Sequence, residues 1–381
     1  MDETTTTTPA SSAAMIDDLR RLVEIESPSS DPGRCRAAGD ELVAIVDERL
    51  GVRPEEVDVG DRRHLVWRFG GPTVDVLLVG HIDTVFPTGT LAERPFAVER
   101  GIATGPGVYD MKSGLVQAVH AIARLDDRAG VALLVNDDEE VGSPSSQELI
   151  AQVAGGAGAA IVFEGASDGD AATLKTARRG VSLYELHVHG RSAHAGINPD
   201  DGANALIEAA HLALRIAELD AGVAGTTVTP TVVQAGTATN VIPDHAVLRV
   251  DARATEVAEQ DRVDAELRAM EPTVPGTTIE VRGGPNRPPM TTDDSDALLA
   301  LARRCAAELG LPPIDGVAVG GGSDASFIAP LGVPVIDGLG GVGGGGHQPD
   351  EWCDTTRMVE RTELAARMIA YLLADRSHTG L

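Results

Sequence analysis

The chain has 381 residues, long enough for two or three domains, each with a core of its own. With 43% hydrophobic and 23% charged residues it has the composition of a soluble globular protein, and no run of about 18 apolar residues is present to cross a membrane. The formal net charge is -27 and the only lysines are Lys112 and Lys175, so we expect no nucleic-acid partner, because phosphates would be repelled.

The N-terminus and the cysteines indicate where the protein works. Residues 1–14 are acidic and then threonine-rich, unlike a secretory signal, and we interpret them as a disordered tail. Cys35, Cys305 and Cys353 are far apart and form no C-x-x-C pair, which argues against a disulfide framework and against a thiolate zinc site. A cytoplasmic protein fits both features.

The first half of the chain alternates between helix and strand patterns. Apolar residues at helical spacing predict two opening helices, and later segments alternate between short apolar runs and amphipathic stretches. The predicted helices cover residues 15–25, 42–50, 111–125 and 147–153, and the predicted strands cover residues 65–69, 74–79, 131–135 and 159–163. This alternation favours an α/β fold.

After Lys175 the pattern changes to that of a smaller α+β insert. Residues 181–189 alternate between apolar and polar side chains, as in a half-exposed antiparallel strand. Helices are predicted at 203–219 and 256–270, strands at 228–233 and 246–254, and a Gly/Pro-rich return linker at 283–289. Residues 294–309, 333–336 and 357–373 then resume the first pattern. We therefore predict a discontinuous domain, residues 15–175 and 289–381, interrupted by an insert at residues 176–288.

Acidic and histidine residues follow several of the predicted strands. His81 and Asp83 follow the strand at 74–79, Asp137–Glu140 follow 131–135, and Glu164 follows 159–163. Asp110 precedes the helix at 111–125. The carboxyl ends of parallel strands meet at one edge of a sheet, where clustered carboxylates repel one another unless a cation is present. Histidine with carboxylates suits zinc, and one shared carboxylate would make a two-metal hydrolytic site.

Each of these residues, taken alone, has an ordinary structural explanation. Asp110 is suited to a helix N-cap, Glu139 and Glu140 to a solvated loop, and Glu164 to an ion pair. The choice between these explanations and a metal site depends on the residues read together.

Read together, the motifs resemble those of the two-zinc peptidases and deacylases, the family of glutamate carboxypeptidase, acetylornithine deacetylase, succinyl-diaminopimelate desuccinylase and aminoacylase. The resemblance spans about residues 15–373. It comprises H-x-D-T-V at 81–85, G-P-G-x-x-D-M-K-x-G at 105–114, D-E-E at 138–140, E-G at 164–165, S-A-H-A-G at 192–196, N-V-I-P at 240–243, G-G-G-S-D-A at 320–325 and His347. The segment H-I-D-T-V-F-P-T-G-T at 81–90, with E-R-P-F at 93–96, is most similar to the glutamate carboxypeptidase branch.

The resemblance implies a fold and a set of metal ligands. The fold would be a mixed sheet flanked by helices, with the insert as a lid and dimerisation domain. Asp110 would bridge two Zn²⁺ ions, with His81 and Glu164 completing the shell of one ion and Glu140 and His347 that of the other. Co²⁺ would be able to replace zinc.

The same resemblance implies catalytic roles. Asp83 would hold the second ring nitrogen of His81, and Glu139 would be the general base that takes a proton from the metal-activated water. The Asp110–Met111 peptide bond would be cis. His194 would donate a hydrogen bond to the oxyanion, in dimeric members from the partner subunit.

Substrate contacts are implied at five positions. Asn240 and Arg253 would contact the carboxylate of the substrate, and Gly321, Gly322 and Ser323 would form a loop around it. The glycine-rich segment lacks the Lys-Ser/Thr of a P-loop, so a phosphate site is not predicted.

The predicted function is hydrolysis of an amide bond in a small peptide or N-acyl amino acid by a homodimeric zinc exopeptidase of the glutamate carboxypeptidase type. The alternative is an N-acyl-amino-acid deacylase such as acetylornithine deacetylase or the desuccinylase. A more remote alternative is a catalytically silent relative that binds a small molecule.

Overall fold

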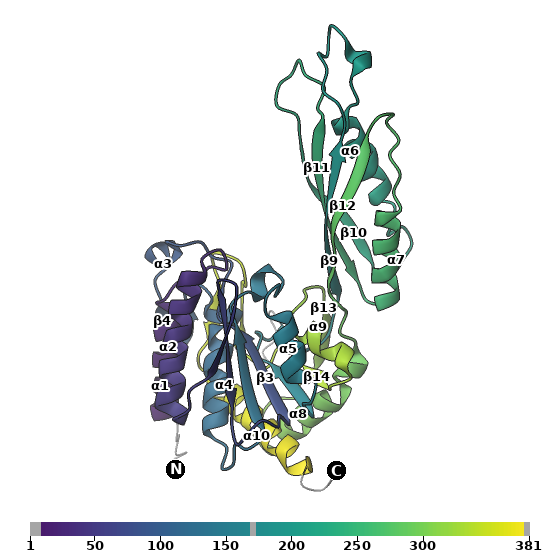
Figure 1. The fold of residues 1–381 in the computed structure, drawn as a ribbon. Coiled ribbons are helices and arrows are strands. Elements are labelled where there is room, and N and C mark those ends of the chain that lie inside the picture. Colours follow the sequence, from purple (N-terminus) through teal and green to yellow (C-terminus); the bar gives the residue numbers. More distant parts are fainter. Residues whose placement is uncertain (1–8, 168–172, 377–381) are drawn as a thin grey trace. The chain divides into compact units, whose positions relative to one another are not determined.

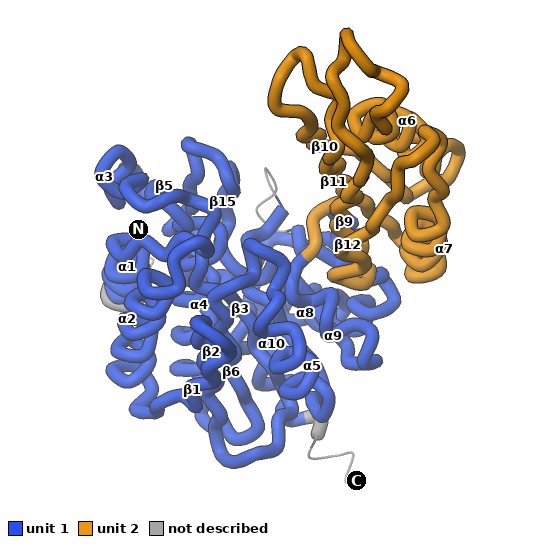
Figure 2. The backbone as a smooth tube through the Cα atoms, turned by 45° about the horizontal axis from the view of Figure 1, so that its top comes forward, with its two compact units in different colours: residues 1–177, 291–319, 323–381 blue, residues 178–290, 320–322 orange. Residues whose placement is uncertain are grey.

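The computed structural model describes residues 9–167 and 173–376, which form two compact units (Figure 2). Unit 1 contains residues 1–177, 291–319 and 323–381, and unit 2 contains residues 178–290 and 320–322. The boundaries thus fall two residues beyond those expected at 175/176 and 288/289. Gly320–Gly322, expected within the discontinuous domain, group with unit 2.

Unit 1 is built on a mixed six-stranded sheet in the order β1-β2-β6-β3-β7-β14 (Figure 1). Strands β6, β3, β7 and β14 are parallel to one another, whereas β2 is antiparallel to both β1 and β6. The strands are β1 (Glu55–Val59), β2 (Arg62–Arg68), β3 (Val76–His81), β6 (Val131–Asn136), β7 (Ala159–Val162) and β14 (Val335–Ile336). The mixed sheet flanked by helices agrees with the predicted fold class.

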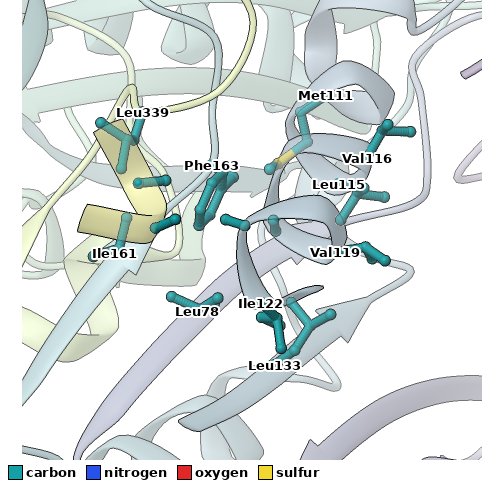
Figure 3. Close-up of a cluster of buried hydrophobic side chains, with 14 of the residues drawn as sticks. Leu78, Met111, Leu115, Val116, Val119, Ile122, Leu133, Ile161, Phe163 and Leu339 are labelled. Carbon is teal, nitrogen blue, oxygen red and sulfur yellow. The ribbon is translucent and has the colours of Figure 1, made fainter. Parts of the chain in front are cut away.

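Helices cover the sheet and bury its apolar strands. Helix α4 packs against α10, α2 and α1, whereas α5 packs against α9. The helices of unit 1 are α1 (Pro9–Val23), α2 (Pro32–Leu50), α3 (Thr90–Glu93), α4 (Ser113–Ala123), α5 (Gln147–Ala154), α8 (Asp296–Glu308), α9 (Ala325–Ile328) and α10 (Met358–Arg376). Alternate strand residues such as Leu78, Leu133 and Ile161 meet Val119 and Ile122 of α4 in one core (Figure 3). Burial of β3 and β6 along their whole length explains their continuous apolar sequence.

Two smaller sheets complete unit 1. Strands β15 (Gly343–Gly344), β16 (Trp352–Asp354), β5 (Ile102–Thr104) and β4 (Ala97–Glu99) form one, and β13 (Gly316–Val319) pairs with β8 (Leu174–Arg178) in the other. Because β16 pairs with β5, the segment after His347 is tied to the segment that leads into Asp110.

Unit 2 is an antiparallel sheet with two helices. Its strand order is β10-β11-β9-β12, and alternate residues such as Tyr184, Leu186 and Val188 form a core with α6. The elements are β9 (Gly180–His189), α6 (Ala205–Ile216), β10 (Thr227–Ala235), β11 (His245–Ala254), α7 (Val257–Arg268) and β12 (Thr278–Arg287).

Two predictions are wrong in detail. The expected tail through residue 14 is too long, because α1 begins at Pro9, where a missing N–H costs a helix nothing; residues 1–8 lie outside the described residues. The expected linker at 283–289 belongs largely to β12. Gly283 has a φ of 80°, the register shifts between Pro285 and Arg287, and β12 is an edge strand, where glycine and proline are tolerated.

Two further observations concern the length of the helices and the state of the cysteines. Within the described residues, no helix combines the length and apolar character needed to cross a membrane. Cys35, Cys305 and Cys353 are buried free thiols.

Gly114 allows α4 to approach the end of β7, which leads to Glu164. A Cβ atom at Gly114 would lie 1.9 Å from the carbonyl oxygen of Phe163. We expect Gly114→Ala to destabilise the protein by about 1–3 kcal/mol, because the clash outweighs the better helix propensity of alanine. The matched control is Gly156→Ala, where a Cβ atom meets nothing within 4 Å. Equal thermal midpoints for the two variants would contradict this account.

Candidate metal centre

Two neighbouring parallel strands place His81 and Glu164 at the same edge of the main sheet. His81 is the last residue of β3, and Glu164 follows β7, which pairs with β3 in parallel. His81 is also in register with Asn136, the last residue of β6, so the segment 137–140 leaves the sheet at this edge. His81 Nε2 lies 3.6 Å from Glu164 Oε1.

Asp110 lies between two histidines. Its Oδ1 is 3.3 Å from Nε2 of His81, and its Oδ2 is 3.3 Å from Nε2 of His347. Asp110 is held in the turn Val108–Lys112 that precedes α4, and the Asp110–Met111 peptide bond is cis, as predicted. A carboxylate with one histidine at each oxygen has the arrangement that a bridging ligand requires.

Glu140 and His347 complete the cluster. Nε2 of His347 lies 2.9 Å from Oε2 of Glu140, which follows β6 in the short helical turn Glu139–Val141. His347 follows β15 with a φ of 65°, a left-handed conformation that histidine adopts more readily than most residues. Its side chain is 54% exposed, so this side of the cluster is open to solvent.

The electrostatics of the cluster favour a cation. Burial raises the pKa of Glu140 to about 7, and hydrogen bonds to Asp110 and Glu140 raise the pKa of His347 to about 11. Oε1 of Glu140 is buried without a hydrogen bond. These are signs of carboxylates crowded together with too little positive charge. Ligand atoms of His81, Asp110 and Glu140, and those of His81, Glu139 and Glu164, lie within 4.8 Å of one another. This set of nitrogen and oxygen donors fits divalent zinc.

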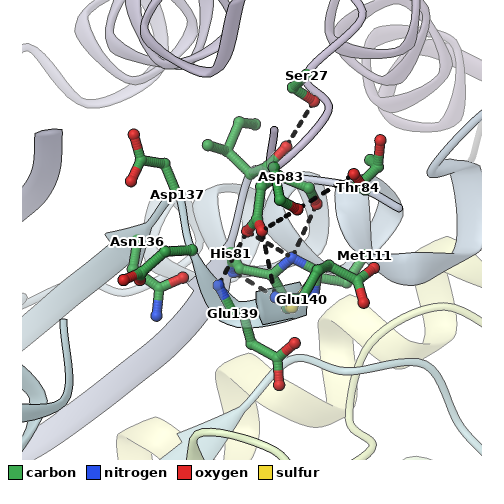
Figure 4. Close-up of polar contacts among 12 residues, drawn as sticks. Ser27, His81, Asp83, Thr84, Met111, Asn136, Asp137, Glu139 and Glu140 are labelled. Carbon is green, nitrogen blue, oxygen red and sulfur yellow. Dashed lines mark hydrogen bonds and ion pairs between the residues drawn. The ribbon is translucent and has the colours of Figure 1, made fainter. Parts of the chain in front are cut away.

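Asp83 organises the segment behind the cluster (Figure 4). Its carboxylate accepts hydrogen bonds from the backbone N–H groups of Glu139 and Glu140, both at 3.2 Å, and from the hydroxyl of Ser29 at 2.6 Å. Nδ1 of His81 is 3.0 Å from the carbonyl oxygen of Asp83 and 3.4 Å from its carboxylate. The ring is therefore oriented mainly by the backbone of Asp83, whereas the side chain fixes the Glu139–Glu140 turn.

In unit 2, His194 and Asn240 come together. The N–H of Ala195 donates to the carbonyl of Asn240 at 2.9 Å, and His194 forms an antiparallel bridge with Val241. Arg253 is at the other end of β11 from this loop, and both oxygens of Asp251 accept from its guanidinium at 2.7 Å. Arg253 is therefore separated from His194 and Asn240, and its charge is paired with that of Asp251.

The glycine-rich loop has internal partners. Carbonyl oxygens of Gly321 and Gly322 accept from the guanidinium of Arg178 at 3.2 and 3.0 Å. Ser323 is buried and donates to Asp337 at 2.6 Å. Because its hydroxyl is engaged, the predicted substrate contact by Ser323 has no support from this geometry.

Two buried carboxylates near the cluster were missed by the sequence analysis. Glu351 accepts hydrogen bonds from the N–H groups of Gly107, Tyr109 and Asp110 at 2.8–2.9 Å. Asp324 accepts from the side chains of Asn136 and Ser143, both at 2.6 Å. Asp324 lies in the motif at 320–325 and Glu351 lies just beyond His347, but the hydrogen-bond partners that mark these carboxylates come from residues distant in sequence. Glu351 follows His347 by four residues, so it links the segments that provide Asp110 and His347.

We expect Glu351→Gln to weaken divalent metal binding by roughly 10- to 100-fold, the usual scale for removing a group that orients a ligand. A glutamine amide presents N–H groups towards backbone donors and cannot accept all of these hydrogen bonds. Titration of the metal-free protein with Zn²⁺ measures the effect. Asp350→Asn, at the exposed neighbouring position, is the control and should bind as the unmodified protein does. Equal affinities in both variants would show that Glu351 does not position Asp110.

Comparisons with known proteins identify the family of the chain. Residues 77–371 match the model of peptidase family M20/M25/M40. The chain is 32% identical to carboxypeptidase G2 of Pseudomonas sp. (strain RS-16), over 95% of this chain and 90% of that protein. It is 29% identical to succinyl-diaminopimelate desuccinylase of Wolinella succinogenes, over 83% and 88%. A metallo-carboxypeptidase of family M20 from Sulfolobus solfataricus has a similar fold, with a TM-score of 0.75, 15% identity, and coverage of 98% and 99%. The chain belongs to peptidase family M20/M25/M40, a family of metal-dependent hydrolases.

Proposed function

We propose that the protein is a zinc-dependent exopeptidase of the carboxypeptidase type, which hydrolyses the last amide bond of a small peptide or N-acyl amino acid. The observation that carries this proposal is Asp110, with one carboxylate oxygen 3.3 Å from each of two histidines, as expected for a two-metal centre. The 32% identity to carboxypeptidase G2 over nearly the whole chain supports this choice of bond.

The proposed ligands are Asp110, shared between two ions, with His81 and Glu164 on one side and Glu140 and His347 on the other. Two Zn²⁺ ions, or Co²⁺ in their place, would lower the pKa of a bound water molecule and polarise the scissile carbonyl. Glu139 is buried beside His81 and Glu164, where its carboxylate can take a proton and return it to the departing nitrogen. The carboxylate of Asp83 accepts a hydrogen bond from the backbone N–H of Glu139 and so keeps Glu139 in place.

A deacylase is the second candidate, and the relationship to succinyl-diaminopimelate desuccinylase favours it. Both candidates break an amide bond next to an amino acid, so the same centre serves either reaction, and the pocket around the side chain decides between them. The remote candidate is a catalytically silent binding protein. The buried side chain of Glu139 beside the proposed metal ligands argues against it. Location in the cytoplasm remains our proposal, in keeping with the free cysteines.

A substrate panel tests the proposal. The zinc-loaded protein should release C-terminal glutamate from dipeptides and N-acyl glutamates faster than it releases succinate or acetate from N-acyl diamino acids. Glu139→Gln should retain its metal and lose roughly 10²–10⁴-fold in rate, the scale for loss of a general base. The reverse preference in the panel would favour the deacylase, and metal binding without any hydrolysis would favour the silent relative. Loss of zinc in Glu139→Gln would make Glu139 a ligand.

We further propose that unit 2 forms a homodimer with a second copy of itself. Ile207 and Leu214 of α6 lie seven residues apart on one helix face and are 46% and 70% exposed. Val232 and Val233 are exposed on β10, which is an edge strand and packs beside α6. A long edge strand next to an apolar helix face is a surface that a symmetric partner can cover.

The hydrogen bonds of His194 suit a role as donor in such a dimer. Its Nδ1 accepts from the N–H groups of Gly196 and Ile197, each at 3.1 Å. The ring proton of the neutral imidazole is therefore on Nε2, where it is available to donate to an oxyanion. In a dimer this donor would complete the site of the partner chain.

Mixing two inactive variants tests the dimer. His194→Ala and Glu139→Gln chains should each have low activity, whereas a mixture with proven subunit exchange should recover towards about a quarter of full activity, since about half the dimers are mixed and each holds one intact site. Absence of recovery despite exchange would mean that His194 acts within its own chain or not at all. A monomer in solution would contradict the proposed dimer directly.

A further inference from the structure

A second cluster of metal-ligating side chains lies in unit 1, outside the centre described above. It consists of His64 on β2 and Asp137 and Asp138, which follow β6, the strand paired with β2. All three side chains are buried, and one ligand atom from each lies within 4.8 Å of the others. The side chain of Asp137 points away from His81 and Asp83 (Figure 4).

The hydrogen bonds around Ser145 determine where the proton of His64 resides. The hydroxyl of Ser145 donates to Oδ2 of Asp138 at 2.6 Å, so its oxygen is left to accept from Nε2 of His64 at 3.0 Å. Burial lowers the pKa of His64, which favours the neutral ring. The ring nitrogen Nδ1 therefore presents a lone pair and no proton.

This lone pair faces another acceptor. Nδ1 of His64 is 3.7 Å from Oδ1 of Asp137, and neither atom has a hydrogen bond although both are buried. Two buried acceptors that face each other without a donor between them lose their hydration without compensation. Something with positive charge or with hydrogens has to lie between them in the folded protein.

Nearby charges leave room for a cation. Asp137 and Asp138 bring two carboxylates, and Arg62 is the basic side chain closest to Asp137, with 3.9 Å between Nη1 and Oδ1. That guanidinium already donates to the carbonyls of Asp137 and Ser29, so it lies at the margin of the cluster and not between its acceptors. The guanidinium of Arg63 is directed to Asp40 and Glu56. Burial raises the pKa of Asp137 to about 7. With both carboxylates ionised, one negative charge remains unbalanced.

We propose that His64 Nδ1, Asp137 and Asp138 form a third divalent-metal site, which binds Zn²⁺ or a similar transition ion through one nitrogen and two carboxylates. Imidazole and carboxylates together are the donors such ions prefer. The ion would connect β2 to the start of the segment 137–140 and so fasten the turn that bears Glu139 and Glu140. It touches no reacting atom, and its role is therefore to position that turn.

Counting zinc in the full-length protein tests the proposal. After removal of metal and dialysis against Zn²⁺, we expect about three ions per unmodified chain and about two in His64→Asn. The background variant Asp110→Ala, which lacks the proposed bridging ligand of the active-site pair, should retain about one ion, and the combination with His64→Asn should hold none. Zn²⁺ should also raise the thermal midpoint of Asp110→Ala and not that of the combined variant.

Two further variants keep the result interpretable. Asp137→Asn preserves side-chain volume and should lower the zinc count as His64→Asn does, even if His64→Asn folds poorly. His120→Asn removes another buried histidine of unit 1, one that already has Asp18 as its partner at 2.7 Å, and should leave the count unchanged. Equal counts in the unmodified chain, folded His64→Asn and Asp137→Asn would overturn the site and leave a water molecule or a shared proton between the two acceptors. This difference is independent of whether the active-site pair binds as proposed.

Discussion

The structure of unit 1 depends on how carboxylates are kept together at one edge of a sheet. Parallel strands β3, β6 and β7 end side by side, so whatever follows them meets at that edge. In this chain mostly acids follow, together with His81. Their mutual repulsion in a partly buried place is offset by histidines on both oxygens of Asp110 and, in the proposed enzyme, by two cations. Burial raises the pKa of Glu140 to about 7 even with His347 2.9 Å away, so the cluster is short of positive charge.

A second set of carboxylates holds in place the loops that carry the proposed metal ligands. Asp83 accepts the N–H groups of Glu139 and Glu140, Glu351 accepts those of the turn around Asp110, and Asp324 fixes Asn136 at the end of β6. Charge-assisted hydrogen bonds of this kind are stronger than neutral ones and are directional. They convert irregular loops into rigid supports for ligands, which a metal centre needs because its ligands must keep their positions in water.

The two edges of the sheet in unit 2 differ in their residues. Its sheet buries one face against helices, and β10 and β12 form its edges. Glycine and proline in β12 are compatible with one edge, whereas the exposed valines of β10 and the apolar face of α6 leave the other suited to a partner chain. The loop that contains His194, between β9 and α6, is joined by backbone hydrogen bonds to the loop that contains Asn240, between β10 and β11. Backbone N–H groups also bond to Nδ1 of His194, so the ring is presented with a defined tautomer.

The sequence by itself determined the class of fold and the buried strands, because apolar periodicity is a local property of the chain. Its motifs also predicted the residues that the structure gathers around Asp110. It also placed the insert to within a few residues. It did not reveal β12, since its glycine and proline content is typical of a linker and only pairing with β9 makes it a strand. Tertiary structure alone decided that Glu351 supports Asp110, that Ser323 is engaged by Asp337, and that Arg253 is neutralised by Asp251. It likewise placed Nδ1 of His64 3.7 Å from Oδ1 of Asp137, although the two residues are 73 positions apart and no sequence pattern predicted their contact. Hydrogen-bond partners of buried charges are chosen by strand register and loop geometry, and these form only when the whole sheet has assembled.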